Sequence, residues 1–257
     1  VSTGREQLMT IAVVDCETTG LDPDRDEMIE LAVSRIVLDR VSGKVVDIEE
    51  PGSWLNEPSA PLPTAIAQLT GLTDDDLVGQ RFVDADILAA FEGVALVVAH
   101  NAVFDRGFVT RCFPSLGKLP WACSLREIDW LAAGLGSRSV TALLTETGHF
   151  LPDAHRAAAD VWATACLLYL PDQTGRSFAA QLVETASRDT MRVFATGAPF
   201  DCKDALKATG YRWSPTRKAW WTEGEAEAIA RQEIWLRSLS PKIEPVTSTV
   251  TWFDRHA

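Results

Sequence analysis

The cysteines of this sequence are few, odd in number and irregularly spaced. No two of them form a Cys-x-x-Cys pair. This arrangement excludes a disulfide framework and argues against a zinc site. We therefore expect reduced thiols in a cytoplasmic protein. The five cysteines are Cys16, Cys112, Cys123, Cys166 and Cys202.

Long apolar runs are also missing. A membrane-spanning helix needs about 20 consecutive apolar residues, and no segment provides them. The first six residues are polar and lack the pattern of a signal peptide. We expect no membrane association. Internal repeats and low-complexity tracts are absent too, while a 46% apolar content is ordinary for a protein with a folded core.

Basic residues are scarce relative to acidic ones. The chain has 24 Lys and Arg against 36 Asp and Glu, a net charge of −12. A free-standing nucleic-acid-binding protein is usually basic, so the total charge argues against that class. The charge is uneven, however. Residues 1–188 hold 14 basic and 27 acidic residues, whereas residues 189–257 hold 10 and 9. The acidity lies in the first part, where bound cations could offset it.

Apolar runs and turn residues predict an α/β fold for the first part. We expect three strands in a meander, followed by strands alternating with helices, which indicates a mixed sheet flanked by helices. Residues 51–63 have no regular pattern. The expected strands are 8–14, 28–38, 44–48 and 94–99, and the expected helices are 84–92, 101–112, 125–133, 139–147 and 155–170.

A turn-rich stretch at 171–175 predicts a domain boundary. We expect a first domain over 1–175, a linker over 176–190 containing a helix, and a small α+β domain over 191–257. The small domain is rich in tryptophan. Its pattern predicts a short helix ended by Gly210, a hairpin over 211–221 and a helix over 225–239.

Two carboxylates follow the first predicted strand. Asp15 and Glu17 lie two residues apart, so their side chains project to one side and Cys16 projects to the other. Two carboxylates on one face repel each other unless a cation lies between them. Oxygen ligands without nearby His or Cys favour magnesium or manganese.

Two further acidic residues occur at the starts of predicted helices. Asp105 falls in the first turn of the helix that follows strand 94–99, with Asn101 at the N-cap. Asp160 lies on the helix over 155–170. His155 and Asp160 would point roughly 140° apart within one regular helix, so we place His155 on the looser entry to that helix.

Four carboxylates and one imidazole suit phosphodiester hydrolysis. Two divalent cations about 4 Å apart can activate a water and stabilise the leaving oxygen. An imidazole with a pKa near 6.5 can accept a proton close to neutral pH. The sequence therefore predicts metal-dependent hydrolysis with two Mg²⁺ or Mn²⁺ ions.

The sequence resembles the DEDDh family of 3′–5′ exonucleases over about residues 8–172. The resemblance rests on three motifs in order, Asp15-x-Glu17-Thr-Thr-Gly, His100-Asn-x-x-Phe-Asp105 and His155-x4-Asp160. It implies a ribonuclease H-like fold and action at 3′ ends. It also implies that Asp15, Glu17 and Asp160 hold the first metal, that Asp105 serves the second with Asp15, and that His155 is the general base.

The same resemblance implies a site for the terminal nucleotide. The backbone of Thr18, Thr19 and Gly20 would meet that nucleotide, and Leu21 and Phe104 would line its pocket. Asn101 is a further candidate contact. The candidate substrate residues are thus Thr18, Thr19, Gly20, Leu21, Asn101 and Phe104.

Three other features have simpler interpretations. The acidic run after Thr73 predicts a helix start, where carboxylates favour the helix dipole. His100 is expected to form local hydrogen bonds. Cys16 is not expected to be reactive, because it should face away from the metals.

Basic and aromatic residues share the predicted C-terminal hairpin. Arg212, Arg217 and Lys218 could contact phosphates, and Trp220 could stack on a base. The alternative is that the tryptophans fill the core of a small domain. Trp220 and Trp221 are adjacent in a strand and must face opposite ways, so one of them could be core and the other exposed.

We expect an exonuclease that releases nucleoside monophosphates from the 3′ end of DNA, with single strands favoured. Action on RNA ends or short oligoribonucleotides is the nearest alternative, because the same five catalytic residues serve both. A polymerase-associated proofreading subunit is a second alternative, with replication or repair proteins as partners. A non-catalytic nucleic-acid-binding protein would not need all five residues.

Overall fold

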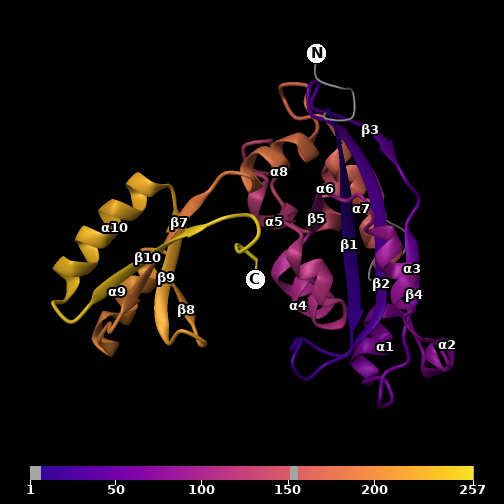
Figure 1. The fold of residues 1–257 in the computed structure, drawn as a ribbon, viewed down its shortest axis with the longest axis horizontal. Helices are drawn as coiled ribbons and strands as arrows, with labels where there is room; N and C mark the ends of the chain where they lie inside the picture. The colour runs from indigo at the N-terminus through magenta and orange to yellow at the C-terminus, as the bar shows by residue number, and fades with distance from the viewer. Residues whose placement is uncertain (1–6, 151–155, 257) are drawn as a thin grey trace. The chain divides into compact units, whose positions relative to one another are not determined.

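The computed structural model describes residues 7–150 and 156–256, which form two compact units (Figure 1). The first unit contains the residues up to Ser187 together with those from Trp252 onward, and the second is Arg188–Thr251. Within the described residues, no helix combines the length and the apolar character needed to cross a membrane.

The first unit is built on a six-stranded mixed sheet. The order is β3-β2-β1-β5-β6, and β4 pairs with β2. β1, β2 and β3 are antiparallel neighbours, whereas β5 and β6 run parallel to β1. The strands are β1 (Leu8–Thr18), β2 (Met28–Asp39), β3 (Lys44–Ile48), β4 (Gly52–Leu55), β5 (Leu96–Ala99) and β6 (Trp121–Cys123).

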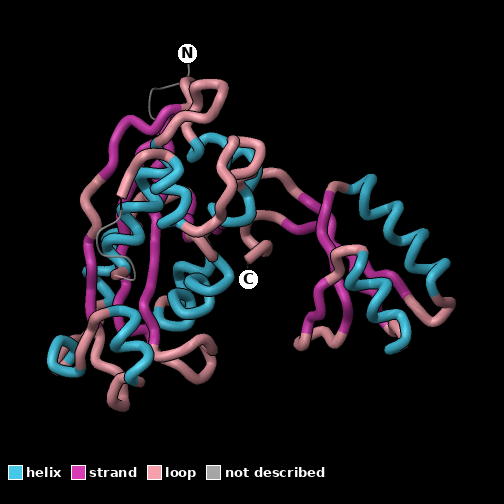
Figure 2. Tube along the Cα trace, turned by 180° about the vertical axis from the view of Figure 1, so that it is seen from behind, coloured by secondary structure: helices cyan, strands magenta, loops and turns pink. Residues whose placement is uncertain are grey.

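Helices cover both faces of this sheet, which confirms the expected α/β class (Figure 2). Side chains of β1 alternate between two apolar cores: Val13 packs with residues of α6, α7 and α8, and Val14 packs with residues of α3 and α4. The helices are α1 (Thr64–Thr70), α2 (Asp74–Leu77), α3 (Asp84–Ala90), α4 (Ala102–Cys112), α5 (Ser124–Glu127), α6 (Val140–Glu146), α7 (Ala157–Tyr169) and α8 (Phe178–Ala186).

Several local predictions are confirmed and others need correction. Thr73 caps α2 through a capping box with Asp76, as the acidic run indicated. The helix expected over 125–133 is replaced by the shorter α5, and residues 130–134 form turns. β4 lies within the segment expected to be irregular, and β6 was not expected. Both strands are short and depend on pairing with distant strands.

The second unit is a four-stranded antiparallel sheet with two helices. Its strand order is β10-β7-β9-β8. The predicted hairpin is present as β8 (Arg212–Ser214) and β9 (Ala219–Gly224), and the predicted helices are α9 (Lys203–Ala208) and α10 (Ala226–Leu239). The two other strands, β7 (Thr190–Thr196) and β10 (Glu244–Val250), were not predicted. Their paired residues are 48 or more positions apart in the sequence.

The segment predicted as a linker, 176–190, belongs mostly to the first unit. Phe178 and Leu182 of α8 are buried in its core, and the Phe178 ring lies 4.9 Å from the Trp130 ring, between centroids. The first unit therefore extends to Ser187 rather than ending at residue 175.

The last residues also return to the first unit instead of ending in the second. The Trp121 N–H donates to the Trp252 carbonyl (3.0 Å). The Glu127 carboxylate pairs with Arg255 (2.8 Å) and His256 (3.1 Å), and all three side chains are almost fully buried. We call residues 252–256 the return segment. Because of it, the second unit is an insertion in the first.

Candidate active site

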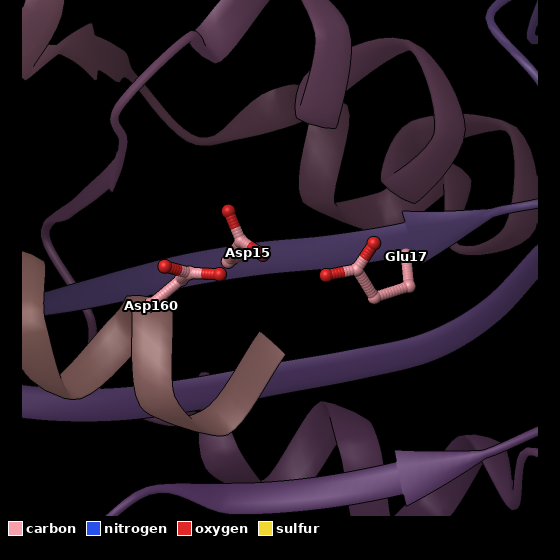
Figure 3. Close-up of side chains that lie close together, drawn as sticks. All are labelled: Asp15, Glu17 and Asp160. Carbon is pink, nitrogen blue, oxygen red and sulfur yellow. The ribbon is translucent and has the colours of Figure 1, made fainter. Parts of the chain in front are cut away.

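Three of the predicted metal ligands come together. One carboxylate oxygen from each of Asp15, Glu17 and Asp160 can be chosen so that all three lie within 4.8 Å of one another. Figure 3 shows the three carboxylates turned toward one another, two from β1 and one from α7. Such an oxygen-only set is the type of site that a hard divalent cation prefers.

The strand period and the start of α7 position these groups. Asp15 and Glu17 continue the side of β1 on which Val13 packs with α7, so both project toward that helix. Asp160 lies in the first turn of α7, four residues after the N-cap Arg156. The positive end of the helix dipole favours a carboxylate there.

Asp105 lies beside this cluster but is not one of its three members. β5 ends at Ala99, so the last part of β1 has no parallel strand next to it. The Cys16 N–H donates instead to Asp105 Oδ1 (3.2 Å), and the Cys16 thiol donates to the same oxygen (3.5 Å). Asp105 is buried and reaches the site from the first turn of α4.

The electrostatics of the site favour a bound cation. Burial first, and then the charge of Asp105, raise the pKa of Asp15 well above its usual range. Burial and the charge of Asp160 raise the pKa of Glu17 to about 8, and burial raises that of Asp105 to about 7. In a protein these carboxylates stay ionised at neutral pH most readily when a cation lies among them. The residues present thus fit a divalent metal.

A buried ion pair next to the cluster was not predicted. Glu30, on β2, lies opposite Glu17 in the strand register and is 1% exposed. Its carboxylate accepts hydrogen bonds from Ser53 Oγ (2.8 Å) and from Arg156 Nε (3.2 Å). The signal in the sequence was a lone acidic residue within the apolar run Met-Ile-Glu-Leu-Ala-Val.

The predicted general base, His155, lies outside the described residues. Helix α7 begins at Ala157, two residues after His155 in the sequence, so the placement expected for His155 stays a prediction. His100, by contrast, has the local role predicted for it. Its ring nitrogens lie 2.9 Å from Ser124 Oγ and 2.7 Å from the Arg138 carbonyl oxygen, and burial lowers its pKa.

The candidate nucleotide loop follows β1 directly. Thr18 Oγ1 donates to the Gly20 carbonyl (2.6 Å), and Thr19 Oγ1 accepts from the Glu27 N–H (2.9 Å). A Cβ on Gly20 would overlap the Asp26 carboxylate. The loop is thus held by its own hydrogen bonds, and Leu21 extends from it with 84% of its surface exposed.

The second candidate substrate element is the start of α4. Asn101 occupies the N-cap position, but its side chain makes no capping hydrogen bond and is exposed. The Phe104 ring is half-buried against Phe108, with centroids 5.1 Å apart. Asn101 is therefore available for other contacts, and Phe104 presents part of one ring.

The four candidate contacts at the C-terminus lie on the hairpin of the second unit. Arg212, Arg217 and Lys218 are exposed. Trp220 is half-buried and packs against that unit's apolar core, which favours the structural interpretation for this residue.

Comparison with known proteins identifies the first unit. Residues 12–168 match the family described as exonuclease. The PolC-type DNA polymerase III of Halalkalibacterium halodurans is 36% identical over 163 residues, 61% of this chain, and that of Bacillus cereus is 34% identical over 166 residues, 62% of the chain. The chain spans 11% of the length of each polymerase.

A solved structure shows the same fold. It is Escherichia coli exonuclease I in complex with a dT13 oligonucleotide, with a TM-score of 0.55 and 15% identity, covering 96% of this chain and 64% of the other. This likeness confirms the ribonuclease H-like architecture. The family match covers residues 12–168, and the acidic residues of the three motifs lie within or beside one cluster. This chain therefore belongs to the exonuclease family and is a nuclease of the DEDDh type.

Proposed function

We propose that this protein removes nucleoside monophosphates one at a time from the 3′ end of DNA, with single strands preferred, and that it requires divalent cations. The observation that carries the proposal is the cluster of Asp15, Glu17 and Asp160 at the end of β1, with Asp105 beside it. The matched polymerases act on DNA by name, which favours DNA over RNA.

Four carboxylates would hold the cations. Asp15, Glu17 and Asp160 would hold one ion, and Asp105 with Asp15 would serve a second, in part through water. Bound Mg²⁺ or Mn²⁺ lowers the pKa of a water molecule and offsets the charge of the phosphate. The raised pKa values of Asp15, Glu17 and Asp105 support this assignment, because an empty cluster of this kind would take up protons.

His155 is the proposed general base. It would accept a proton from the attacking water, whose oxygen forms a bond to the phosphorus of the terminal nucleotide. The bond from that phosphorus to the 3′ oxygen of the preceding nucleotide breaks. The products are a nucleoside 5′-monophosphate and a strand one nucleotide shorter, with a new 3′ hydroxyl.

The terminal nucleotide is proposed to lie between the loop after β1 and the start of α4. The backbone of Thr18, Thr19 and Gly20 would face its sugar and phosphate. Leu21 and Phe104 would contact its base and sugar, and Asn101 would supply a polar contact. The exposure of Leu21 and Asn101 supports this assignment.

A single gel experiment tests the proposal. The full chain is incubated with 5′-labelled single-stranded DNA, double-stranded DNA or RNA, in Mg²⁺, Mn²⁺ or EDTA. We expect stepwise shortening of single-stranded DNA with either metal, no reaction in EDTA, and loss of activity in Asp15→Asn. Asp47→Asn, a change at an exposed carboxylate of β3, is the matched control and should be fully active.

Each arm of that experiment can contradict one part of the proposal. Activity that survives EDTA would exclude metal dependence. Faster shortening of RNA than of DNA would assign the enzyme to RNA ends. Release of the 5′ label as a mononucleotide at the earliest times would show that hydrolysis starts at the 5′ end. A polymerase-associated role predicts co-purification with a replicative polymerase, which the same protein preparation can test.

A further inference from the structure

Polar side chains extend from the carboxylate cluster across the face of the first unit's sheet that α7 covers. Glu17 of β1 lies opposite Glu30 of β2, and Ala32 of β2 lies opposite Ser53 of β4. Strand partners point to one side, as do residues two positions apart on one strand. Ala32 belongs to the core that α7 forms with this face, so Glu30 and Ser53 lie on the same side as the cluster.

Both carboxylate oxygens of Glu30 are engaged. Oε1 accepts hydrogen bonds from Ser53 Oγ (2.8 Å) and Arg156 Nη2 (3.5 Å), and Oε2 accepts one from Arg156 Nε (3.2 Å). Glu30 is buried, and a buried carboxylate is stable only when it is paired and hydrogen-bonded. Glu30 is not one of the three carboxylates that come together as a potential metal site. Its contacts use its charge to hold Arg156 instead.

Arg156 is the residue from which α7 starts. It occupies the N-cap position with an extended backbone, and it makes no side-chain capping hydrogen bond. A guanidinium has no acceptor atom, so it cannot bind the free N–H groups of the first turn as a Ser or Asp side chain would. The Arg156 carbonyl accepts the Asp160 N–H (3.0 Å) and closes that turn. A contact that holds Arg156 therefore also holds the turn that carries Asp160.

The ion pair and the cluster join the same two parts of the fold. In the cluster, Asp160 of α7 meets Glu17 of β1. In the ion pair, Arg156 of α7 meets Glu30 of β2, the strand next to β1. The carboxylates of the cluster repel one another when no cation lies among them, and this repulsion acts to move the start of α7 away from the sheet. The attraction between Glu30 and Arg156 opposes that movement.

We propose that Glu30 and Arg156 are positioning residues of the nuclease site. Their ion pair holds the start of α7 against the sheet, so that Asp160 reaches the spacing from the two carboxylates of β1 that a shared cation needs. Neither residue touches the cation or the nucleotide. The inference rests on the proposed function for the assignment of the cluster to a divalent metal. Partners that orient metal ligands in this way contribute roughly 10–100-fold to metal affinity or activity.

Steady-state hydrolysis of 5′-labelled oligo-dT by the full chain tests the inference, at a temperature at which thermal unfolding shows every variant to be folded. We expect Arg156→Met to lower kcat and to raise the half-saturating Mn²⁺ concentration, each by about tenfold, and to leave KM for DNA within about threefold. Arg156→Lys keeps the cation and should recover part of both losses. Arg176→Met breaks the exposed pair with Glu184 and is the matched control, with wild-type values expected.

Two further variants separate positioning from stability. Arg156→Met/Glu30→Gln removes the buried charge that Arg156→Met leaves unpaired, so stability should be recovered in part. The link to α7 is still absent, so kcat and the Mn²⁺ dependence should stay impaired. Ser53→Ala removes one donor to Glu30 but keeps both charges, and it should shift the Mn²⁺ dependence in the same direction by about twofold. This milder variant provides the test if Arg156→Met does not fold.

Other results would overturn the inference. Wild-type kcat and Mn²⁺ dependence in folded Arg156→Met would show that the pair does not position the site. A raised KM for DNA with unchanged kcat would make Arg156 a substrate contact instead. Recovery of kcat together with stability in the double variant would assign the pair a purely structural role.

Mn²⁺ binding without DNA separates this inference from the proposed function. The EPR signal of free Mn²⁺ gives the metal affinity of the full chain whether or not the chain cleaves DNA. Weaker Mn²⁺ binding by Arg156→Met than by the wild type would support the positioning role even if neither protein shortened DNA, and only the proposed function would then be refuted. Equal Mn²⁺ affinity in the two proteins would overturn the inference.

Discussion

Glu30 and Arg156 join strand β2 to the first turn of α7. The Arg156 Nε lies 3.2 Å from Glu30 Oε2; the Glu30 side chain is 1% exposed and that of Arg156 is 44% exposed. Asp160 lies one helical turn after Arg156, and Glu17 lies across the strand from Glu30. The pair therefore connects the two elements that present the proposed metal ligands.

Removing one partner of this pair should destabilise the first unit. We expect Arg156→Met to lower the free energy of unfolding by about 1–3 kcal/mol, because the Glu30 carboxylate is left buried without its cation. Glu30→Gln in the same chain should recover part of the loss. Urea unfolding in EDTA measures both. Arg176→Met, which breaks the exposed pair with Glu184, should cost less than about 1 kcal/mol. Additive effects of the two changes at 30 and 156 would show that the residues are not coupled.

A bound cation should stabilise the protein through the carboxylate cluster. A metal present at about 100 times its Kd adds about 2.7 kcal/mol to the free energy of unfolding. We expect Mg²⁺ or Mn²⁺ to raise the melting temperature of the wild type and of Asp47→Asn. Asp160→Asn should lose this increase together with activity. An equal increase in Asp160→Asn, measured by thermal unfolding, would show that the metal binds elsewhere.

The stability of the metal-free protein should fall as the pH rises toward 8. In the folded chain the pKa of Glu17 is raised to about 8 and that of Asp105 to about 7, so between the usual range for carboxyl groups and these values the folded state holds more protons than the unfolded state. Each group then lowers the free energy of unfolding by up to about 1.4 kcal/mol per pH unit. Their contribution is complete below pH 4 and lost above pH 8.

Chemical unfolding in EDTA from pH 5 to 8 measures this dependence. Saturating metal should flatten the curve, because it favours the ionised carboxylates and competes with protons. Glu17→Gln removes one of the two groups and should reduce the slope. A metal-free stability that rises over this interval would contradict the assigned pKa shifts.

The thiols should differ in reactivity. Burial, followed by the charge of Asp105, raises the pKa of the Cys16 thiol well above its usual value, whereas Cys112 is exposed. We expect Cys112 to react first with a thiol reagent such as DTNB, and Cys16 to react only on unfolding. Cys112→Ser is the control that identifies the fast phase. A fast phase that persists in this variant and is lost in Cys16→Ser would contradict the buried environment.

The grouping of the three carboxylates could be predicted from the sequence, because local periods determine most of it. The two-residue period of β1 placed Asp15 and Glu17 on one side, and the start of α7 placed Asp160 in a first turn. To predict the contact between Asp105 and Cys16, one would have to know where β5 ends relative to β1. That register is a long-range property, so the pattern at 100–105 alone could not give it.

The unpredicted parts of the fold all depend on distant partners. β4 and β6 are four and three residues long, too short to be recognised without the strands they pair with. In the sequence Glu30 is a single acidic residue within an apolar strand. Its partner Arg156 lies 126 residues later, so the ion pair between them could not be predicted. The first unit extends past the boundary expected at 175 for the same reason, since α8 completes a core formed much earlier in the chain.

The return segment has a consequence for the order of events during synthesis. Trp121 and Glu127 receive hydrogen-bond and ion-pair partners from residues 252–256, so the first unit lacks these contacts until that segment has left the ribosome. The second unit, whose strands all lie within residues 190–250, can complete its sheet earlier. The inserted unit can therefore finish folding before the unit that contains it, and a chain that stops before residue 252 would lack these contacts to Trp121 and Glu127.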